Sequence, residues 1–128
     1  MPTILVVDDE PSIRGFLRAV LEGRGDRLLE AADGVSALQM AQRERPDLIL
    51  LDIALPGLSG MEVCRRLRAN PATAESPVLL LSGFVQARER REAAKAGAQG
   101  VIAKPFSPAA LAARIEDALR RRPAVASR

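Results

Sequence analysis

The sequence contains no histidine, tryptophan or tyrosine, three phenylalanines and a single cysteine, Cys64. Without histidine, the chain cannot supply imidazole metal ligands, a Ser-His or Cys-His nucleophile pair, or a phosphohistidine of its own. Base stacking would rest on three phenylalanine rings, which argues against a nucleic-acid-binding surface. One cysteine excludes an internal disulfide, and its place on an apolar helical face predicts a core residue.

Long hydrophobic runs are absent as well. No apolar run approaches the roughly 20 residues of a membrane span, and no signal peptide opens the chain, so we expect a cytoplasmic protein without a membrane partner. The 128 residues carry a formal charge of +3, with basic and acidic side chains intermixed, so the charge pattern does not indicate direct nucleic-acid binding. This length and 48% hydrophobic residues predict one domain with a substantial core.

Short apolar runs alternate with amphipathic segments along the chain. We expect strands at residues 4–7, 28–31, 48–52, 78–81 and 101–103, each followed by a helix. On the second helix Val35 is expected to face inward, and Gly23 and Gly25 are expected to end the first. The fourth helix, near residues 86–96, offers only the alanines Ala87, Ala93 and Ala94 on its apolar face, which predicts weak anchoring.

The alternation of strands and helices predicts an α/β fold. Five strands joined by helices form a single doubly wound parallel sheet that is covered on both faces. The connections are too short for two domains. We therefore expect one domain over residues 1–122, and a tail or linker remnant over residues 123–128.

Four of the five expected strands end in polar or charged residues, namely Asp8 and Asp9, Asp52, Ser82 and Lys104. Open parallel sheets bind ligands at the carboxyl ends of their strands. At separations of about 4 Å and an effective dielectric constant of about 20, each pair of carboxylates repels by roughly 4 kcal/mol. We therefore expect a bound cation at this edge, with Asp52 as the reacting group.

Several short motifs resemble the receiver domain of bacterial two-component response regulators, over residues 3–119. The matching stretches are Val6-Val7-Asp8-Asp9-Glu10, Asp52 with Leu55-Pro56-Gly57 and Gly60, Ser82-Gly83, and Gly97-Ala98 through Lys104-Pro105-Phe106. The resemblance implies a flavodoxin-like, chemotaxis-regulator-like sheet of strand order 2-1-3-4-5. It also implies phosphorylation of Asp52 by the phosphohistidine of a histidine kinase or phosphotransfer protein. Such a domain is not a classical enzyme, although it catalyses its own phosphorylation and dephosphorylation.

The resemblance also implies the roles of the other residues at this edge. A Mg²⁺ or Mn²⁺ ion would be held by Asp8, Asp9, Asp52 and the backbone carbonyl of Ala54. Lys104 and the Ser82 hydroxyl would contact phosphoryl oxygens. Switching would involve Ser82, Val101 and Pro105, with a cis peptide bond before Pro105 aiming Lys104 into the site. The family usually has an aromatic residue where this chain has Val101, and valine cannot make a large ring rotation.

The expected output surface consists of the fourth helix, the last strand and the last helix. It would bind a downstream protein or an output domain, and a homodimer is left open. One alternative is a phosphorylation-independent interaction module of the same fold, and another is a receiver excised from a larger regulator or hybrid kinase. A phosphatase of the haloacid dehalogenase type would need a second acid where this chain has Ala54. A flavodoxin-type flavin site would need a Ser/Thr/Gly-rich loop after the first strand.

Overall fold

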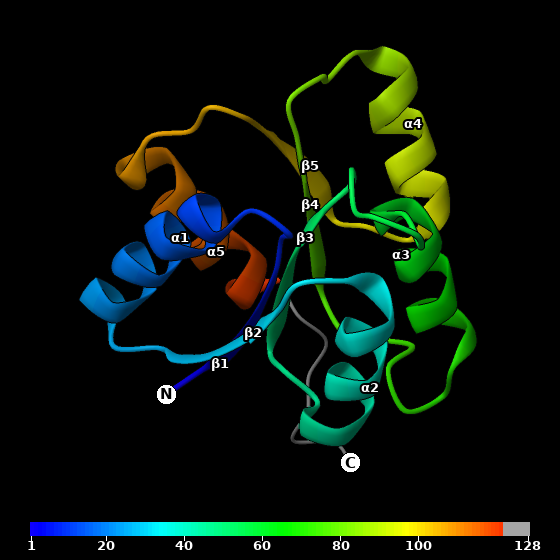
Figure 1. The fold of residues 1–128 in the computed structure, drawn as a ribbon, viewed down its shortest axis with the longest axis horizontal. Helices are drawn as coiled ribbons and strands as arrows, with labels where there is room; N and C mark the ends of the chain where they lie inside the picture. The colour runs from blue at the N-terminus through cyan, green and yellow to red at the C-terminus, as the bar shows by residue number, and fades with distance from the viewer. Residues whose placement is uncertain (122–128) are drawn as a thin grey trace.

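The computed structural model describes residues 1–121 and shows a parallel sheet between two layers of helices (Figure 1). Within these residues the strands are β1 (Thr3–Val7), β2 (Arg27–Ala31), β3 (Leu48–Asp52), β4 (Val78–Ser82) and β5 (Gly100–Ala103). The helices are α1 (Pro11–Arg24), α2 (Gly34–Glu44), α3 (Gly60–Ala69), α4 (Ala87–Ala96) and α5 (Pro108–Arg120). The strand order is β2-β1-β3-β4-β5, and all neighbouring strands are parallel, which confirms the predicted fold class.

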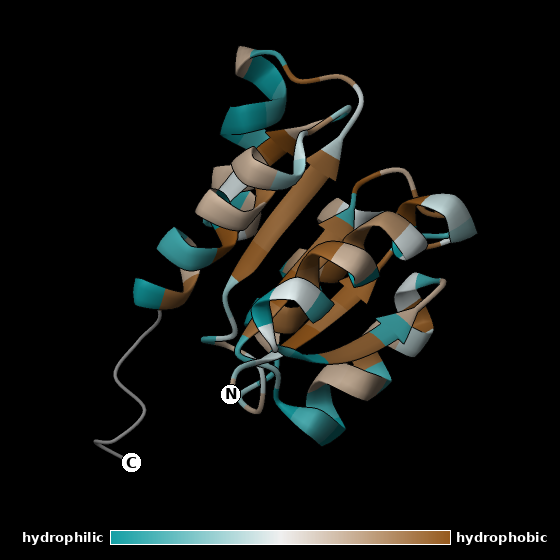
Figure 2. Ribbon diagram, turned by 90° about the vertical axis from the view of Figure 1, so that its left-hand side faces the viewer, coloured by the Kyte–Doolittle hydropathy of each residue, from teal (hydrophilic) through white to brown (hydrophobic). Residues whose placement is uncertain are grey.

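Both faces of the sheet are buried, because the side chains of each strand alternate between two cores. Along β1, Leu5 and Val7 belong to one core, and Ile4 and Val6 belong to the other. The first core lies under α2, α3 and α4, and the second under α1 and α5. Figure 2 shows the apolar strands enclosed between helices of mixed hydropathy. Burial on both faces explains why β3 and β4 are almost continuously apolar rather than alternating, whereas the edge strand β2 contains Arg27 and Glu30.

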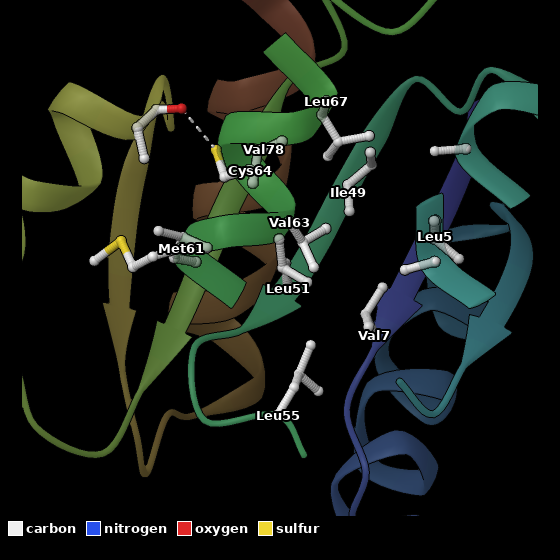
Figure 3. Close-up of a cluster of buried hydrophobic side chains, with 14 of the residues drawn as sticks. Leu5, Val7, Ile49, Leu51, Leu55, Met61, Val63, Cys64, Leu67 and Val78 are labelled. Carbon is white, nitrogen blue, oxygen red and sulfur yellow. Dashed lines mark hydrogen bonds between the residues drawn. The ribbon is translucent and has the colours of Figure 1, made fainter. Parts of the chain in front are cut away.

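Helix α3 packs on the sheet through Val63, Cys64 and Leu67, which are almost completely buried (Figure 3). The Cys64 thiol donates a hydrogen bond to the carbonyl of Ala96 at the end of α4, with an Sγ–O distance of 3.2 Å. Burial raises the pKa of this thiol, which keeps it protonated. Cys64 is therefore a core residue, as predicted.

Helix α4 is attached mainly through its C-terminal end. Its buried side chains are Ala93 and Ala96. Of the three alanines predicted on the apolar face, Ala93 is confirmed, whereas Ala87 and Ala94 are exposed because the helix turns Ala96 toward the core instead. Arg68 of α3 donates to the carbonyl of Gly97 through Nε, at 3.0 Å, and through Nη2, at 2.8 Å. These bonds and the one from Cys64 hold the last turn of α4, whereas its first turns rest on little buried apolar area.

The prediction that Gly23 helps to end the first helix is wrong. Helix α1 continues through Gly23 to Arg24 and ends at Gly25, which has the positive φ of 81° that favours glycine. A glycine inside a helix weakens it by only about 1 kcal/mol. The burial of Leu17 and Leu21 on the inner face of α1 stabilises the helix by more than that loss, so the helix continues through Gly23.

The prediction that Val35 faces inward is also wrong, because its side chain is 58% exposed. Helix α2 faces the sheet through Gly34, Ala37 and Ala41 instead. A Cβ atom at Gly34 would lie 2.7 Å from Cγ2 of Val63, so α2 and α3 meet at a point where only glycine fits. This close approach sets the rotation of α2 and turns Val35 toward solvent.

In residues 1–121, no helix has both the length and the apolar character that crossing a bilayer requires. The predicted domain boundary at residue 122 and the predicted tail at residues 123–128 lie outside the described residues.

Candidate functional site

The predicted site residues meet at the edge of the sheet where the strands end. Asp8 follows β1, Asp52 ends β3, Ser82 ends β4 and Lys104 follows β5. Because all strands are parallel and in register, their carboxyl ends lie at one edge. The fold thus brings together four residues that are far apart in the sequence, at the position where parallel sheets bind ligands.

Lys104 pairs with two carboxylates at this edge. Its Nζ lies 3.1 Å from Oδ2 of Asp8 and 3.4 Å from Oδ1 of Asp52. The side chains of Asp8 and Asp52 are 0% and 5% exposed, and that of Lys104 is 17% exposed. One ammonium group therefore balances two carboxylates that are almost out of contact with water.

The pKa values of this group reflect its burial and its charges. Burial raises the pKa of Asp52, the negative charge of Asp8 raises it further, and Lys104 only partly opposes these effects. Burial alone would lower the pKa of Lys104, but its bond to Asp8 and the charge of Asp52 raise it overall. Lys104 is thus held in its charged form, and the site favours the binding of additional positive charge.

A cluster of carboxylates lies at the end of β1. Oxygen atoms of Asp8, Asp9 and Glu10 lie within 4.8 Å of one another, and Asp9 and Glu10 are exposed. Asp8 is fixed more firmly, because its Oδ1 accepts a hydrogen bond from the backbone N–H of Glu10 at 2.9 Å. Glu10 was not among the predicted ligands, although it belongs to the acidic run that was recognised in the sequence.

The chemistry of these donors fits a hard divalent cation. Mg²⁺ and Mn²⁺ prefer oxygen ligands, and Mg²⁺ usually binds one or two protein carboxylates while it keeps several waters. Asp8 and Asp9 offer such oxygens, and Lys104 joins Asp8 to Asp52, the pKa of which is raised mainly by burial and further by the charge of Asp8. The residues present therefore fit the expected ion.

The loop after β3 holds the backbone of Asp52 in place. Oδ1 of Asp52 accepts a hydrogen bond from the N–H of Ala54 at 3.3 Å, and the N–H of Gly60 donates to the carbonyl of Ile53 at 2.9 Å. A Cβ atom at Gly60 would lie 2.2 Å from the Asp52 carbonyl oxygen, so only glycine fits there. Ser59 caps α3 at this point, because its hydroxyl accepts a hydrogen bond from the N–H of Glu62.

The Ser82 hydroxyl is engaged with the β4–α4 loop. It donates to the carbonyl of Phe84 at 2.9 Å and accepts from the N–H of Phe84 at 3.1 Å. Phe84 itself is 61% exposed. The fold thus places Ser82 at the predicted edge, with its hydroxyl hydrogen-bonded to the main chain of Phe84, which was not among the predicted site residues.

Val101 and Pro105 lie on and just after β5. Val101 is 2% exposed in the core beneath α4, and its carbonyl accepts a hydrogen bond from Arg114 of α5 at 3.4 Å. The Lys104–Pro105 peptide bond is cis, as the resemblance implied. The N–H of Lys104 donates to the carbonyl of Ser82 at 2.8 Å, which ties the end of β5 to the end of β4.

A largely apolar hollow of about 260 Å³ adjoins the acidic edge. It lies between the start of α1 and the β5–α5 loop, and its lining residues are Ser12, Ile13, Phe16, Lys104, Pro105 and Phe106. The rings of Phe16 and Phe106, both in its lining, stack with their centroids 5.4 Å apart. The charged edge and an apolar surface are therefore contiguous.

Comparison with protein families identifies the fold independently. A family model described as the response regulator receiver domain matches residues 4–116. Among curated proteins, the phosphate regulon transcriptional regulatory protein PhoB of Pseudomonas aeruginosa is 41% identical over 119 residues. The DNA-binding dual master transcriptional regulator RpaA of Synechocystis is 38% identical over 121 residues. These matches cover 93% and 94% of this chain but 52% and 50% of the relatives, so the chain spans about half the length of the curated relatives it matches.

Solved structures give the same result. The chemotaxis protein CheY4 of Vibrio cholerae superposes with a TM-score of 0.88 at 32% identity, over 92% of this chain and 98% of that one. The receiver domain of a sensor histidine kinase from Pseudomonas aeruginosa, which has a magnesium ion coordinated in its active site cleft, superposes with a TM-score of 0.86. It is 32% identical, over 93% of this chain and 98% of that one. The sequence match, the sheet order and these superpositions agree, and the chain belongs to the family of response regulator receiver domains.

Proposed function

We propose that this receiver domain accepts a phosphoryl group on Asp52 from the phosphohistidine of a histidine kinase or a phosphotransfer protein, in the cytoplasm. The observation that carries the proposal is the contact of Lys104 with both Asp8 and Asp52. A carboxylate that attacks a phosphate needs positive charge beside it to offset the phosphoryl oxygens. Lys104 provides this charge at the strand ends, next to Asp52, whose pKa is raised by burial and by the charge of Asp8.

The transfer follows from the position of these groups. An oxygen of Asp52 attacks phosphorus in line while the bond from phosphorus to the imidazole nitrogen of the donor breaks, and that nitrogen keeps the electron pair. The product is an acyl phosphate on Asp52. Lys104 then donates a hydrogen bond to one phosphoryl oxygen. The Ser82 hydroxyl breaks its hydrogen bond to the carbonyl of Phe84 and donates to a second phosphoryl oxygen. Water in place of the departing donor then attacks the phosphorus slowly, the bond from phosphorus to the Asp52 oxygen breaks, and inorganic phosphate leaves while the carboxylate is regenerated.

The acidic cluster supports a divalent ion as the cofactor, Mg²⁺ or Mn²⁺. We propose that Asp8, Asp9, Asp52 and the backbone carbonyl of Ala54 hold it, with Asp8 acting through a water molecule. When bound, the ion supplies positive charge to the carboxylates and to the incoming phosphoryl group. Because Lys104 occupies Oδ2 of Asp8, it must loosen this contact when the ion and the phosphoryl group bind.

We further propose that phosphorylation shifts the population of two arrangements of the surface formed by α4, β5 and α5. The weak attachment of the first turns of α4 supports this proposal, since a helix held mainly at one end can reorient. The surface would bind a downstream protein, an output domain or a second copy of the chain. That the relatives are named as transcriptional regulators supports a role in the control of transcription.

The test is the incorporation of labelled phosphate from acetyl phosphate and Mg²⁺ into purified protein. We expect wild type to take up close to one phosphoryl group per chain and to release it with hydroxylamine, as an acyl phosphate does. Asp52→Asn should take up none. The matched control is Asp33→Asn, because Asp33 caps α2 and asparagine caps helices equally well. Undiminished labelling of Asp52→Asn would remove Asp52 from its proposed role, and unlabelled wild type would favour the phosphorylation-independent module.

A further inference from the structure

Arg14 of α1 reaches back from the helix to the acidic end of β1. Its Nη1 donates a hydrogen bond to the backbone carbonyl of Asp8, and its Nε lies 3.5 Å from Oε1 of Glu30. The Arg14 side chain is only 20% exposed. The guanidinium group thus joins the chain at the end of β1 to a carboxylate on β2, and none of the roles assigned above uses it.

Glu30 is itself held in place. It lies on β2 opposite Val6 of β1, and its two carboxylate oxygens accept from Nε and Nη2 of Arg18 at 2.9 and 2.8 Å. A bidentate pair of this kind restricts both side chains to one arrangement. Glu30 therefore gives Arg14 a fixed anchor rather than a mobile partner.

The main chain at Asp8 is held on both sides. The N–H of Asp8 donates to the carbonyl of Ala31 on β2 at 3.2 Å, and the carbonyl of Asp8 accepts from Arg14. That carbonyl belongs to the peptide group that joins Asp8 to Asp9. Its direction therefore sets the backbone of Asp9.

The position of Asp9 depends on this peptide more than on its own side chain. Among the residues that the structure describes, the exposed carboxylate of Asp9 has no hydrogen-bond or ion-pair partner, unlike that of Asp8. Its oxygens nevertheless lie within 4.8 Å of those of Asp8 and Glu10. Nothing but the backbone keeps the Asp9 carboxylate in the cluster.

We propose that Arg14 is a positioning residue for the divalent ion: anchored by Glu30, it fixes the Asp8–Asp9 peptide so that the Asp9 carboxylate faces the metal position. This inference rests on the metal site of the proposed function. Groups that orient metal ligands from behind commonly change metal affinity by about 10- to 100-fold when they are removed. Arg14 does so without touching the ion, because its hydrogen bond is to the backbone carbonyl of Asp8 and not to a carboxylate of the cluster.

The experiment is a Mg²⁺ titration of wild type, Arg14→Met, Arg14→Lys and Arg18→Met, followed through the backbone amide resonances of Asp9 and its neighbours. We expect Arg14→Met to bind Mg²⁺ about 10-fold more weakly or worse. Arg14→Lys, which can still donate to the Asp8 carbonyl, should recover part of the affinity. Arg18→Met is the graded comparison: it loosens the anchor Glu30 but does not contact Asp8, so we expect a smaller loss than in Arg14→Met, within about threefold of wild type.

Glu30→Gln provides a second route if Arg14→Met does not fold. It leaves the arginine in place without its charged anchor, and we expect an intermediate loss of Mg²⁺ affinity. Wild-type affinity in folded Arg14→Met or in Glu30→Gln would overturn the positioning role, and so would an equal loss in Arg18→Met. If Asp52 is labelled by acetyl phosphate while these variants bind Mg²⁺ normally, only this inference fails. If wild type binds no Mg²⁺, the proposed metal site fails with it.

Discussion

Replacing Lys104 by methionine is the sharpest test of the charge balance at the strand ends. The change keeps an unbranched side chain of similar length and removes only the ammonium group. It leaves Asp8 and Asp52 next to each other with no internal cation. Lys95→Met on the outer face of α4 is the matched control, since it removes an exposed lysine that lies away from the site.

The size of the effect follows from the distances. At 3.1 and 3.4 Å and an effective dielectric constant of about 20, each ion pair of Lys104 is worth about 5 kcal/mol before desolvation. Removing one partner of a buried pair usually destabilises a protein by about 3–5 kcal/mol. Lys104 keeps some contact with water and Asp52 can take up a proton, so we expect a loss of about 3 kcal/mol in the free energy of unfolding without metal.

The assay is urea unfolding followed by circular dichroism, first with a chelator and then with saturating Mg²⁺. We expect the difference between wild type and Lys104→Met to shrink with Mg²⁺, because the ion replaces the missing charge. The variant should also bind Mg²⁺ more tightly than wild type, since Lys104 no longer competes for Asp8. A difference below about 1 kcal/mol in chelator, or weaker Mg²⁺ binding by the variant, would refute the reasoning.

The pH dependence of this variant has a definite sign. The pKa of Asp52 is raised above its ordinary value of 3.8 by burial and by Asp8, so the folded state binds more protons than the unfolded state just above that pH. Stability therefore falls as the pH rises through this window. Lys104→Met removes the opposing charge and raises this pKa further. The difference in unfolding free energy from wild type should thus be largest near pH 7 and smaller near pH 4.

Two further predictions concern the neighbouring loops. Gly60→Ala should destabilise the fold by about 1–3 kcal/mol and slow the labelling of Asp52, because its methyl group would overlap the Asp52 backbone. Its control, Gly15→Ala in an open position on α1, should stabilise the fold by about 0.5–1 kcal/mol. Urea unfolding measures the stability of both variants and phosphate labelling the reaction, and a Gly60→Ala variant with unchanged stability would contradict the contact. Phe84→Trp, in a chain without other tryptophan or tyrosine, should change its fluorescence when acetyl phosphate and Mg²⁺ are added, because Ser82 leaves the Phe84 main chain. The same change in a background carrying Ser82→Ala would show that the loop moves for another reason.

The sheet and the position of the site could be predicted from the sequence, because both depend on local patterns. Each buried strand is a continuous apolar run, and the polar residue that ends it marks the carboxyl edge, as at Asp52 and Lys104. The resemblance to a family then supplied the strand order. Parallel pairing then determines the position of the site, since it allows the carboxyl ends of the strands to meet at only one edge.

Two of the differences come from contacts between elements that the local pattern does not encode. Val35 fits an apolar helical stripe, yet the glycine contact between α2 and α3 turns it outward. Arg14 and Glu30 are 16 positions apart and look like ordinary surface charges until α1 packs beside β2. The bond of the Ser82 hydroxyl to Phe84 depends on the path of a loop, for which apolar periodicity carries no information.

The glycine at position 60 has a consequence for how a signal can leave the site. Because the main chain of α3 touches that of Asp52, α3 cannot shift without displacing Asp52. Helix α4 packs beside α3 and against β5, and it is held mainly at its C-terminal end. If Asp52 is phosphorylated as proposed, a movement that starts there is therefore expected to reach α4 rather than α3, and the absence of a side chain at Gly60 decides this direction.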